Sequence, residues 1–297
     1  MSLVVTLICN PAEPELDSTV IDAARSALPS PERGDWLFEG VAADIRFSST
    51  DDIRTISDRL RKALDGLRAD VVVQPQLDRR KKLLLADMDS TMIGQECIDE
   101  LADFAGLKAH VSAITERAMR GEIEFEPALR ERVALLKDLL VTVVDEVLES
   151  RITLTPGAVE LVRTMRANGA YTCLVSGGFT LFTKRVAELI GFQENRANEL
   201  LTENGKLTGQ VAEPILGREA KLATLVDLRE SFDLDNLDTL AVGDGANDLA
   251  MIEQAGAGVA YHAKPAVAAA AGVRIDHGDL TALLYMQGYK RSEFVTG

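Results

Sequence analysis

The fold of this chain is decided by residues 83–91, which read Leu83-Leu84-Leu85-Ala86-Asp87-Met88-Asp89-Ser90-Thr91. The apolar residues that open this stretch predict a strand buried on both faces. In extended backbone, side chains at i and i+2 point the same way, so Asp87 and Asp89 should face one point while Met88 turns aside. Open α/β sheets bind ligands beyond the carboxyl ends of their strands, which makes this strand end a candidate site. Taken alone, the same residues also fit an acidic turn.

Composition and charge narrow the class of protein. The chain has 297 residues, 46% of them hydrophobic and 27% charged, as in ordinary globular proteins. The net charge is 32 − 47 = −15, which argues against the basic face that nucleic acids and anionic membranes require. No apolar run approaches the roughly 18 residues of a membrane span, and no signal peptide is evident. Cys9, Cys97 and Cys173 lack metal-ligand spacing, so we expect buried thiols in a cytoplasmic protein.

Residues 1–76 predict a small α+β unit. Apolar runs at 3–9, 36–38, 41–47 and 71–73 indicate strands, and helical patterns cover 17–28 and 51–67. This βαββαβ order resembles the small regulatory domains of the ACT type, many of which bind amino acids. The resemblance is one of topology alone. An amino-acid effector site and a packing or homodimerisation module without a ligand therefore both stay open.

The segment 94–151 is helical in pattern and interrupts an α/β alternation. It predicts helices at 95–105, 107–120, 125–139 and 143–150. Because this block follows the first strand of the larger unit, we predict a helical cap that covers the site and selects substrate. Strands alternate with helices again from residue 155, which predicts a doubly wound parallel sheet built from residues 77–93 and 152–297.

Two further strand ends carry polar clusters. Ser176-Gly177-Gly178 follows a predicted strand at 171–175, and the segment 243–248, Gly-Asp-Gly-Ala-Asn-Asp, follows one at 239–242. Lys221 lies on a predicted helix between them. Taken alone, Ser176-Gly177-Gly178 is more often a turn and Lys221 more often a solvated helix residue. The segment 243–248 alone favours a functional site, with a Ca²⁺-like or turn motif as the alternative. A parallel sheet brings such strand ends to one edge, so their order and spacing favour a single site.

Together these segments resemble the four motifs of the haloacid dehalogenase (HAD) superfamily of phosphotransferases, in the same order over residues 82–264. Within that superfamily, the segments 87–91, 125–139, 175–179, 204–209 and 241–248, together with Glu96, are similar to the phosphoserine phosphatase family. Members of that family commonly have Phe between the two aspartates, where this chain has Met88. The resemblance implies an HAD-like fold with a helical cap. Residues 1–76 lie outside it.

The resemblance also implies how catalysis would be organised. Asp87 would be the nucleophile that forms an aspartyl-phosphate, and Asp89 would donate and then accept the transferred proton. Mg²⁺, a hard cation that prefers oxygen ligands, would bind Asp87, the backbone carbonyl of Asp89, and Asp244. Asp248 would support the metal site.

Substrate contacts follow from the same resemblance. Ser176 would donate its hydroxyl and Gly177 its backbone N–H to the phosphoryl oxygens, and Lys221 would place a positive charge beside them. Asn247 would bind substrate from the last cluster. In the cap, Glu96 and Arg132 would bind the ammonium and carboxylate of the substrate. For Arg132, a salt bridge to a neighbouring acid stays open as the alternative. Met119 and Phe125 would line the part of the site that holds the serine moiety, with core packing as the simpler alternative.

The expected activity is Mg²⁺-dependent hydrolysis of O-phosphoserine to serine and phosphate, as the last step of serine biosynthesis. Two alternatives stay open. One is a related enzyme that transfers the phosphoryl group to another alcohol such as homoserine. The other is an amino-acid sensor built on residues 1–76 with a vestigial phosphatase.

Overall fold

The computed structural model describes residues 1–296, which divide by their contacts into two compact units. The first unit contains Met1–Lys81, Pro156–Gly169 and the residues from Val273 onward. The second contains Lys82–Thr155 and Ala170–Gly272. The boundaries expected at residues 76, 93 and 151 stay predictions.

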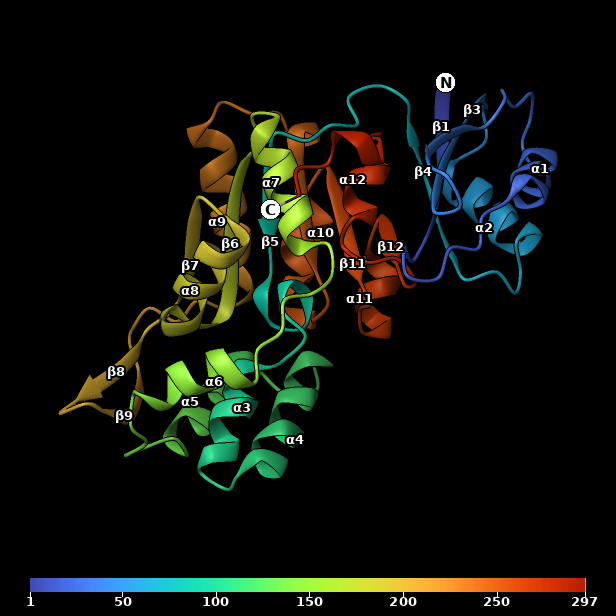
Figure 1. The fold of residues 1–297 in the computed structure, drawn as a ribbon. Helices are drawn as coiled ribbons and strands as arrows, with labels where there is room; N and C mark the ends of the chain where they lie inside the picture. Colours follow the sequence, from blue (N-terminus) through green and yellow to red (C-terminus); the bar gives the residue numbers. More distant parts are fainter. Residues whose placement is uncertain (297) are drawn as a thin grey trace. The chain divides into compact units, whose positions relative to one another are not determined.

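The first unit begins with the βαββαβ order that the sequence indicates. Its elements are β1 (Ser2–Cys9), α1 (Ser18–Ser26), β2 (Asp35–Phe38), β3 (Ala42–Ser48), α2 (Ile53–Ala63) and β4 (Ala69–Pro75). The four strands form an antiparallel sheet in the order β2-β3-β1-β4, with α1 and α2 on one face (Figure 1). Alternate residues of β1, such as Leu3, Val5 and Leu7, form the core beneath these helices. Asp17 and Asp52 cap the two helices by accepting backbone N–H groups, which fixes where each begins.

The remaining elements of the first unit come from later in the chain. They are α7 (Ala158–Ala167), β12 (Val273–Ile275) and α12 (Ala282–Met286). Of these, α12 is not among the predicted helices. The buried carboxylate of Asp70 on β4 accepts backbone N–H groups from Asp276, His277 and Gly278, at 2.7 to 3.3 Å. Arg79 donates to Asp44 and to the carbonyl of Met286, so hydrogen bonds join the first and the last of the three stretches of this unit.

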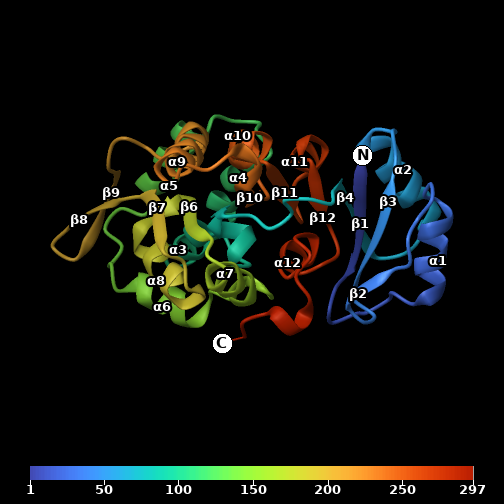
Figure 2. The same cartoon turned by 90° about the horizontal axis from the view of Figure 1, so that it is seen from above.

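The second unit is built on a parallel sheet with the order β11-β10-β5-β6-β7. Figure 2 shows β7, β6, β10 and β11 following one another in this order. The strands are β5 (Leu83–Ala86), β6 (Tyr171–Phe179), β7 (Glu194–Asn198), β10 (Thr239–Gly243) and β11 (Ala257–Tyr261). Helices α8 (Thr180–Ile190), α9 (Arg218–Ser231), α10 (Leu249–Gln254) and α11 (Pro265–Ala270) accompany them. The predicted α/β alternation is thus confirmed, with β5 fully buried at the centre. Strand β7 is not among the predicted strands, because it is half-exposed and carries polar residues with no apolar run.

A helical cap follows β5, as expected. After a tight turn at Met88–Met92, the chain forms α3 (Cys97–Phe104), α4 (Lys108–Met119), α5 (Phe125–Ala134) and α6 (Val143–Ser150). The helix predicted to end at residue 139 ends at Ala134 instead. Asp138 adopts a left-handed φ of 67°, and its backbone N–H donates to Leu207. Pairing with the neighbouring hairpin therefore replaces the last helical turn.

That hairpin consists of β8 (Leu200–Glu203) and β9 (Lys206–Val211). Its turn residues Asn204 and Gly205 have φ values of 51° and 75°, the positive values that a two-residue hairpin turn requires. Within residues 1–296, none of the helices combines the length and apolar character required to cross a bilayer.

Candidate active site

The parallel register brings the predicted polar clusters to one sheet edge. Ala86 at the end of β5 is paired with Val242 on β10 and with Leu174 on β6. Asp87, Asp244 and Ser176 follow within two residues of these positions. All three are at most 3% exposed. The expectation that three strand ends share one site is therefore met by the strand register.

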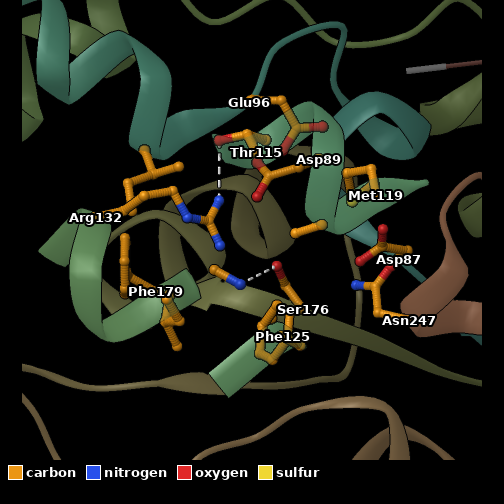
Figure 3. Close-up of a pocket in the computed structure, with 15 residues that line it drawn as sticks. Asp87, Asp89, Glu96, Thr115, Met119, Phe125, Arg132, Ser176, Phe179 and Asn247 are labelled. Atoms are coloured by element: carbon orange, nitrogen blue, oxygen red, sulfur yellow. Dashed lines mark hydrogen bonds between the residues drawn. The ribbon is translucent and has the colours of Figure 1, made fainter. Parts of the chain in front are cut away.

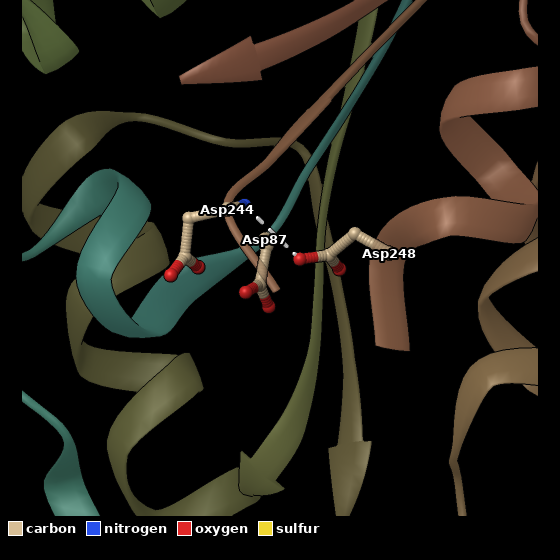
Figure 4. A group of neighbouring side chains, drawn as sticks. All are labelled: Asp87, Asp244 and Asp248. Atoms are coloured by element: carbon tan, nitrogen blue, oxygen red, sulfur yellow. Dashed lines mark hydrogen bonds between the residues drawn. The ribbon is translucent and has the colours of Figure 1, made fainter. Parts of the chain in front are cut away.

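Three aspartates meet behind this edge (Figure 4). Single carboxylate oxygens of Asp87, Asp244 and Asp248 lie within 4.8 Å of one another, and all three residues are buried. Lys221 is fully buried on α9, and its Nζ lies 2.6 Å from Asp87 Oδ1 and 2.6 Å from Asp248 Oδ1. The alternative that Lys221 is a solvated helix residue is thus wrong.

The charges of this cluster do not balance. The cluster holds three carboxylates but one ammonium, which contacts Asp87 and Asp248 and not Asp244. Burial raises the pKa of Asp87 to about 7, with the charge of Asp248 adding to the shift. Burial, and next the charges of Asp248 and Asp87, raise the pKa of Asp244 well above its usual range. Burial lowers the pKa of Lys221, but Asp248 and Asp87 outweigh it and the net shift is upward. A divalent cation would remove this excess of negative charge, and an all-carboxylate donor set suits a hard cation.

Within the cluster, Asp244 is the carboxylate with most capacity left for a metal. Asp248 already bonds Lys221 through one oxygen and the backbone N–H groups of Asp244 and Gly245 through the other. The Asp244 carboxylate has a long contact of 3.5 Å with the Thr91 hydroxyl. The residues present therefore fit a cation held between Asp87 and Asp244.

Asp89 faces the cavity beside Asp87. Its Oδ1 accepts the backbone N–H of Cys97 at 3.3 Å, which ties it to the start of the cap. Burial, and next the charge of Asp87, raise the pKa of Asp89 to about 7. A carboxyl group with this pKa can both donate and accept a proton near neutral pH.

The wall formed by β6 depends on glycine. The Ser176 hydroxyl accepts the N–H of Gly178 at 2.8 Å, and Asn198 donates to the carbonyl of Gly177 at 2.8 Å. A Cβ at Gly177 would lie 2.7 Å from Cζ of Phe125, and one at Gly178 would lie 2.9 Å from Asp89 Oδ2. The absence of side chains thus lets the cap and the catalytic carboxylate approach the backbone closely.

The cap contributes two charged groups to the cavity. Glu96 accepts the Ser90 hydroxyl at 2.6 Å, and burial together with the charge of Asp89 raises its pKa to about 8. Arg132 is 5% exposed, and burial lowers its pKa. Figure 3 shows its guanidinium extending into the cavity from one side, while Asp87 and Asn247 lie on the opposite side.

The expected alternative for Arg132, a salt bridge to a neighbouring acid, is wrong. Its Nε donates to the Ala128 carbonyl at 3.0 Å and its Nη1 to the Thr115 hydroxyl at 2.9 Å. Among residues 1–296 no carboxylate forms an ion pair with this guanidinium. Glu96, Asp99 and Asp89 act on its charge only from beyond ion-pair distance, so direct contact with an anionic ligand is still available to the guanidinium.

Met119 and Phe125 line the cavity, whereas the sequence left core packing open for both. A Cβ at Gly245 would lie 2.4 Å from Cε of Met119, so the cap rests directly on the loop after β10. Asn247 lines the same cavity, and its buried Oδ1 has no hydrogen-bond partner. The remaining cavity measures about 40 Å³, enough for a few water molecules.

Most predicted site residues surround one cavity. These are Asp87, Asp89, Glu96, Arg132, Ser176, Gly177 and Asn247. Lys221, Asp244 and Asp248 lie behind Asp87 in the carboxylate cluster. Sequence reasoning missed the lining residues Ile98, Thr115 and Leu129. Each sits on a mixed helix where an apolar or threonine side chain carries no signal that separates packing from ligand contact.

Comparisons with known proteins agree with this geometry. The family of haloacid dehalogenase-like hydrolases matches residues 84–253. A phosphoserine phosphatase of Polaromonas sp. is 47% identical over 208 residues, which cover 68% of this chain and 88% of that protein. One from Archaeoglobus fulgidus is 46% identical over 215 residues, 72% of this chain, and the chain spans 62% of its length.

A solved structure extends the similarity to the first unit. The HAD family hydrolase of Salmonella enterica serovar Typhi has a TM-score of 0.85 at 27% identity and covers 96% of this chain and 98% of its own. The matched segment 84–253 contains the carboxylate cluster, the glycine wall and the cap. This chain belongs to the haloacid dehalogenase-like hydrolase family.

Proposed function

We propose that this chain is a phosphoserine phosphatase that hydrolyses O-phosphoserine to serine and phosphate. The observation that carries the proposal is one cavity that joins Asp87 and Asp89 to Glu96 and to an arginine without an anionic partner. Phosphoserine has a phosphate, an ammonium and a carboxylate, and these groups match the three parts of the cavity. The names of the relatives that are 46% and 47% identical support the same substrate.

The chemistry uses two carboxyl groups in turn. A carboxylate oxygen of Asp87 attacks phosphorus, the bond from phosphorus to the serine oxygen breaks, and Asp89 gives its proton to that oxygen. Water then attacks phosphorus, Asp89 takes a proton from it, and Asp87 is released with inorganic phosphate. The raised pKa of Asp89, about 7, suits both proton transfers. Ser176, the Gly177 N–H and Lys221 are proposed to hold the phosphoryl oxygens.

Mg²⁺ is the proposed metal, held by Asp87, Asp244 and the backbone carbonyl of Asp89, with Asp248 in support. When bound, it supplies positive charge that neutralises the phosphate and the aspartate. We expect chelator treatment to abolish activity and added Mg²⁺ to restore it. Mg²⁺ should also raise the Tm of the wild-type protein but not of Asp244→Asn, because binding to the native state stabilises it. An equal Tm shift in both proteins would contradict the assignment.

The substrate assignment is tested by a pair of phosphate esters. Phosphoethanolamine has the phosphate and ammonium of phosphoserine but no carboxylate. We expect wild-type kcat/KM to favour phosphoserine, and Arg132→Ala to lower kcat/KM for phosphoserine by about 10- to 100-fold, the value of a charged hydrogen bond of about 1.5–3 kcal/mol. Hydrolysis of phosphoethanolamine should change little. A wild-type enzyme that does not distinguish the two esters would refute the proposed substrate.

Transfer to an alcohol is the second enzymatic candidate. Released phosphate and phosphorylated product, measured with excess homoserine present, separate hydrolysis from transfer. We propose hydrolysis because the two relatives that are 46% and 47% identical are both named as phosphatases. Phosphohomoserine as the main product would reverse this assignment.

We propose that the first unit binds an amino-acid effector. A homodimer contact of this unit, the other expected role, would be additional. A cavity of about 180 Å³ is lined by groups of both signs, including Arg61, Asp65, Arg274 and His277. Such a set suits a zwitterion. Calorimetry with serine and other amino acids, on wild type and Arg274→Ala, tests this. Binding unaffected by Arg274→Ala places the ligand elsewhere, and binding without phosphatase activity would favour the sensor alternative.

The cytoplasm is the proposed location. Cys9, Cys97 and Cys173 are buried free thiols, as expected in a reducing compartment.

A further inference from the structure

The arginine of the cap is held by a relay of hydrogen bonds that crosses three helices. Arg132 on α5 donates from Nη1 to Thr115 Oγ1 on α4 at 2.9 Å. The Thr115 hydroxyl lies 2.7 Å from Asp99 Oδ1 on α3, to which it donates. Thr115 is 3% exposed and Arg132 5% exposed, so water contributes little to this arrangement.

The direction of these hydrogen bonds follows from the chemistry of the groups. A guanidinium can only donate and a carboxylate can only accept, whereas a hydroxyl does both. Asp99 therefore turns the Thr115 proton away from Arg132 and leaves a lone pair for Nη1. The Val111 carbonyl, at 3.1 Å from Thr115 Oγ1, is a weaker alternative acceptor. With Nε on Ala128 and Nη1 on Thr115, the plane of the guanidinium is fixed by two of its five N–H groups.

The remaining N–H groups of Arg132 are available to a ligand in the cavity. Arg132, Thr115 and Glu96 all line it (Figure 3). The two protein acceptors of Arg132 are the Ala128 carbonyl and the Thr115 hydroxyl, and neither is a carboxylate. These neutral groups hold the orientation of the guanidinium without neutralising its charge. A carboxylate placed directly on Arg132 would occupy the edge that the ligand needs. Asp99 instead acts on Arg132 indirectly, through the Thr115 hydroxyl.

We propose that Thr115, oriented by Asp99, is a positioning residue that keeps Arg132 aligned for the carboxylate of the substrate. This inference rests on the proposed function, since it assigns to Thr115 part of the preference for phosphoserine over esters without a carboxylate. Thr115 itself makes no contact with the reacting phosphate in this account.

The test compares Thr115→Val, which keeps the shape but removes the hydroxyl, with Thr115→Ser, which keeps the hydroxyl. We expect Thr115→Val to raise KM for phosphoserine about tenfold and to change kcat less than about twofold, as for loss of one hydrogen bond to a charged group. For phosphoethanolamine, kcat/KM should stay within about twofold. Thr115→Ser should restore the wild-type KM, and Asp99→Asn should raise it less than Thr115→Val.

Two controls separate positioning from packing. Thr142→Val makes the same change at an exposed position of the cap and should leave both substrates unaffected. In an Arg132→Ala background, Thr115→Val should cause no further rise in KM, because residues that act through one group are not additive. If Thr115→Val fails to fold by circular dichroism, Thr115→Ser and Asp99→Asn carry the comparison.

The outcomes distinguish this inference from the proposed function. A wild-type enzyme without preference for phosphoserine defeats both. If the wild-type preference for phosphoserine is unchanged in Thr115→Val, the positioning role alone is wrong. The same holds if kcat/KM falls equally for both esters. An additive effect in the Arg132→Ala background also defeats it.

Discussion

The core side and the cap side of the cavity handle charge in opposite ways. On the core side, Asp87 and Asp248 share the buried ammonium of Lys221, each at 2.6 Å. On the cap side, the buried guanidinium of Arg132 is held by a carbonyl and a hydroxyl. The core therefore carries excess negative charge that suits the binding of a cation, whereas Arg132 in the cap suits the binding of an anion. Under the proposed function, the core performs the reaction that phosphate esters share, and the cap selects among them.

The strongest test of the core is Asp87→Asn. Removal of the nucleophile should lower kcat by at least about 10³-fold for phosphoserine and phosphoethanolamine alike, because both need the same attacking oxygen. Steady-state release of phosphate measures this, and circular dichroism checks that the variant is folded. Loss on one ester only would mean that the division of labour between core and cap is wrong.

A smaller effect is expected where the two sides touch. In Gly177→Ala the new Cβ would lie 2.7 Å from Cζ of Phe125, so the ring must move and the cap must close less tightly. We expect kcat/KM to fall about tenfold on both esters, the cost of about 1.4 kcal/mol of strain in the closed state. Phe125→Leu should recover part of this loss in the double variant. A double variant worse than Gly177→Ala alone would show that Phe125 has another role.

The smallest expected effect is a pH dependence that belongs to the cap. The pKa of Glu96 is raised to about 8, so the free protein holds this group mainly protonated at pH 7 and ionises it as the pH rises. Because the ionised form attracts the substrate ammonium, KM for phosphoserine should fall about fivefold between pH 7 and pH 8, as the ionised fraction grows. The KM should then level off at higher pH.

The matched variants for this pH dependence are Glu96→Gln and Arg132→Ala. Glu96→Gln should flatten the profile, since an amide does not titrate in this range. Arg132→Ala should keep the slope while its KM is higher throughout. A slope that persists in Glu96→Gln would assign the titration to another group.

The sequence predicted the core side better than the cap side. Asp87, Asp244 and Ser176 stand at ends of apolar strands, and a parallel sheet has few ways to arrange such ends. The cap residues Glu96 and Arg132 were reached through family resemblance, because a charged residue on a mixed helix has no local signal of function. The same limit hid Thr115 and Asp99. The polar strand β7 and the early end of α5 at Ala134 were missed because pairing with distant segments formed them.

By itself, the sequence determined the parallel α/β core, the helical insertion after its first strand and the set of carboxylates at the sheet edge. Strand periodicity and the order of motifs are local properties of the chain, so they can be read without coordinates. Only the tertiary structure decided that Lys221 is buried between two aspartates and that Arg132 lacks an acidic partner. These facts depend on which distant side chains share a space without water, since burial and neighbouring charge fix the cost of each ionised group.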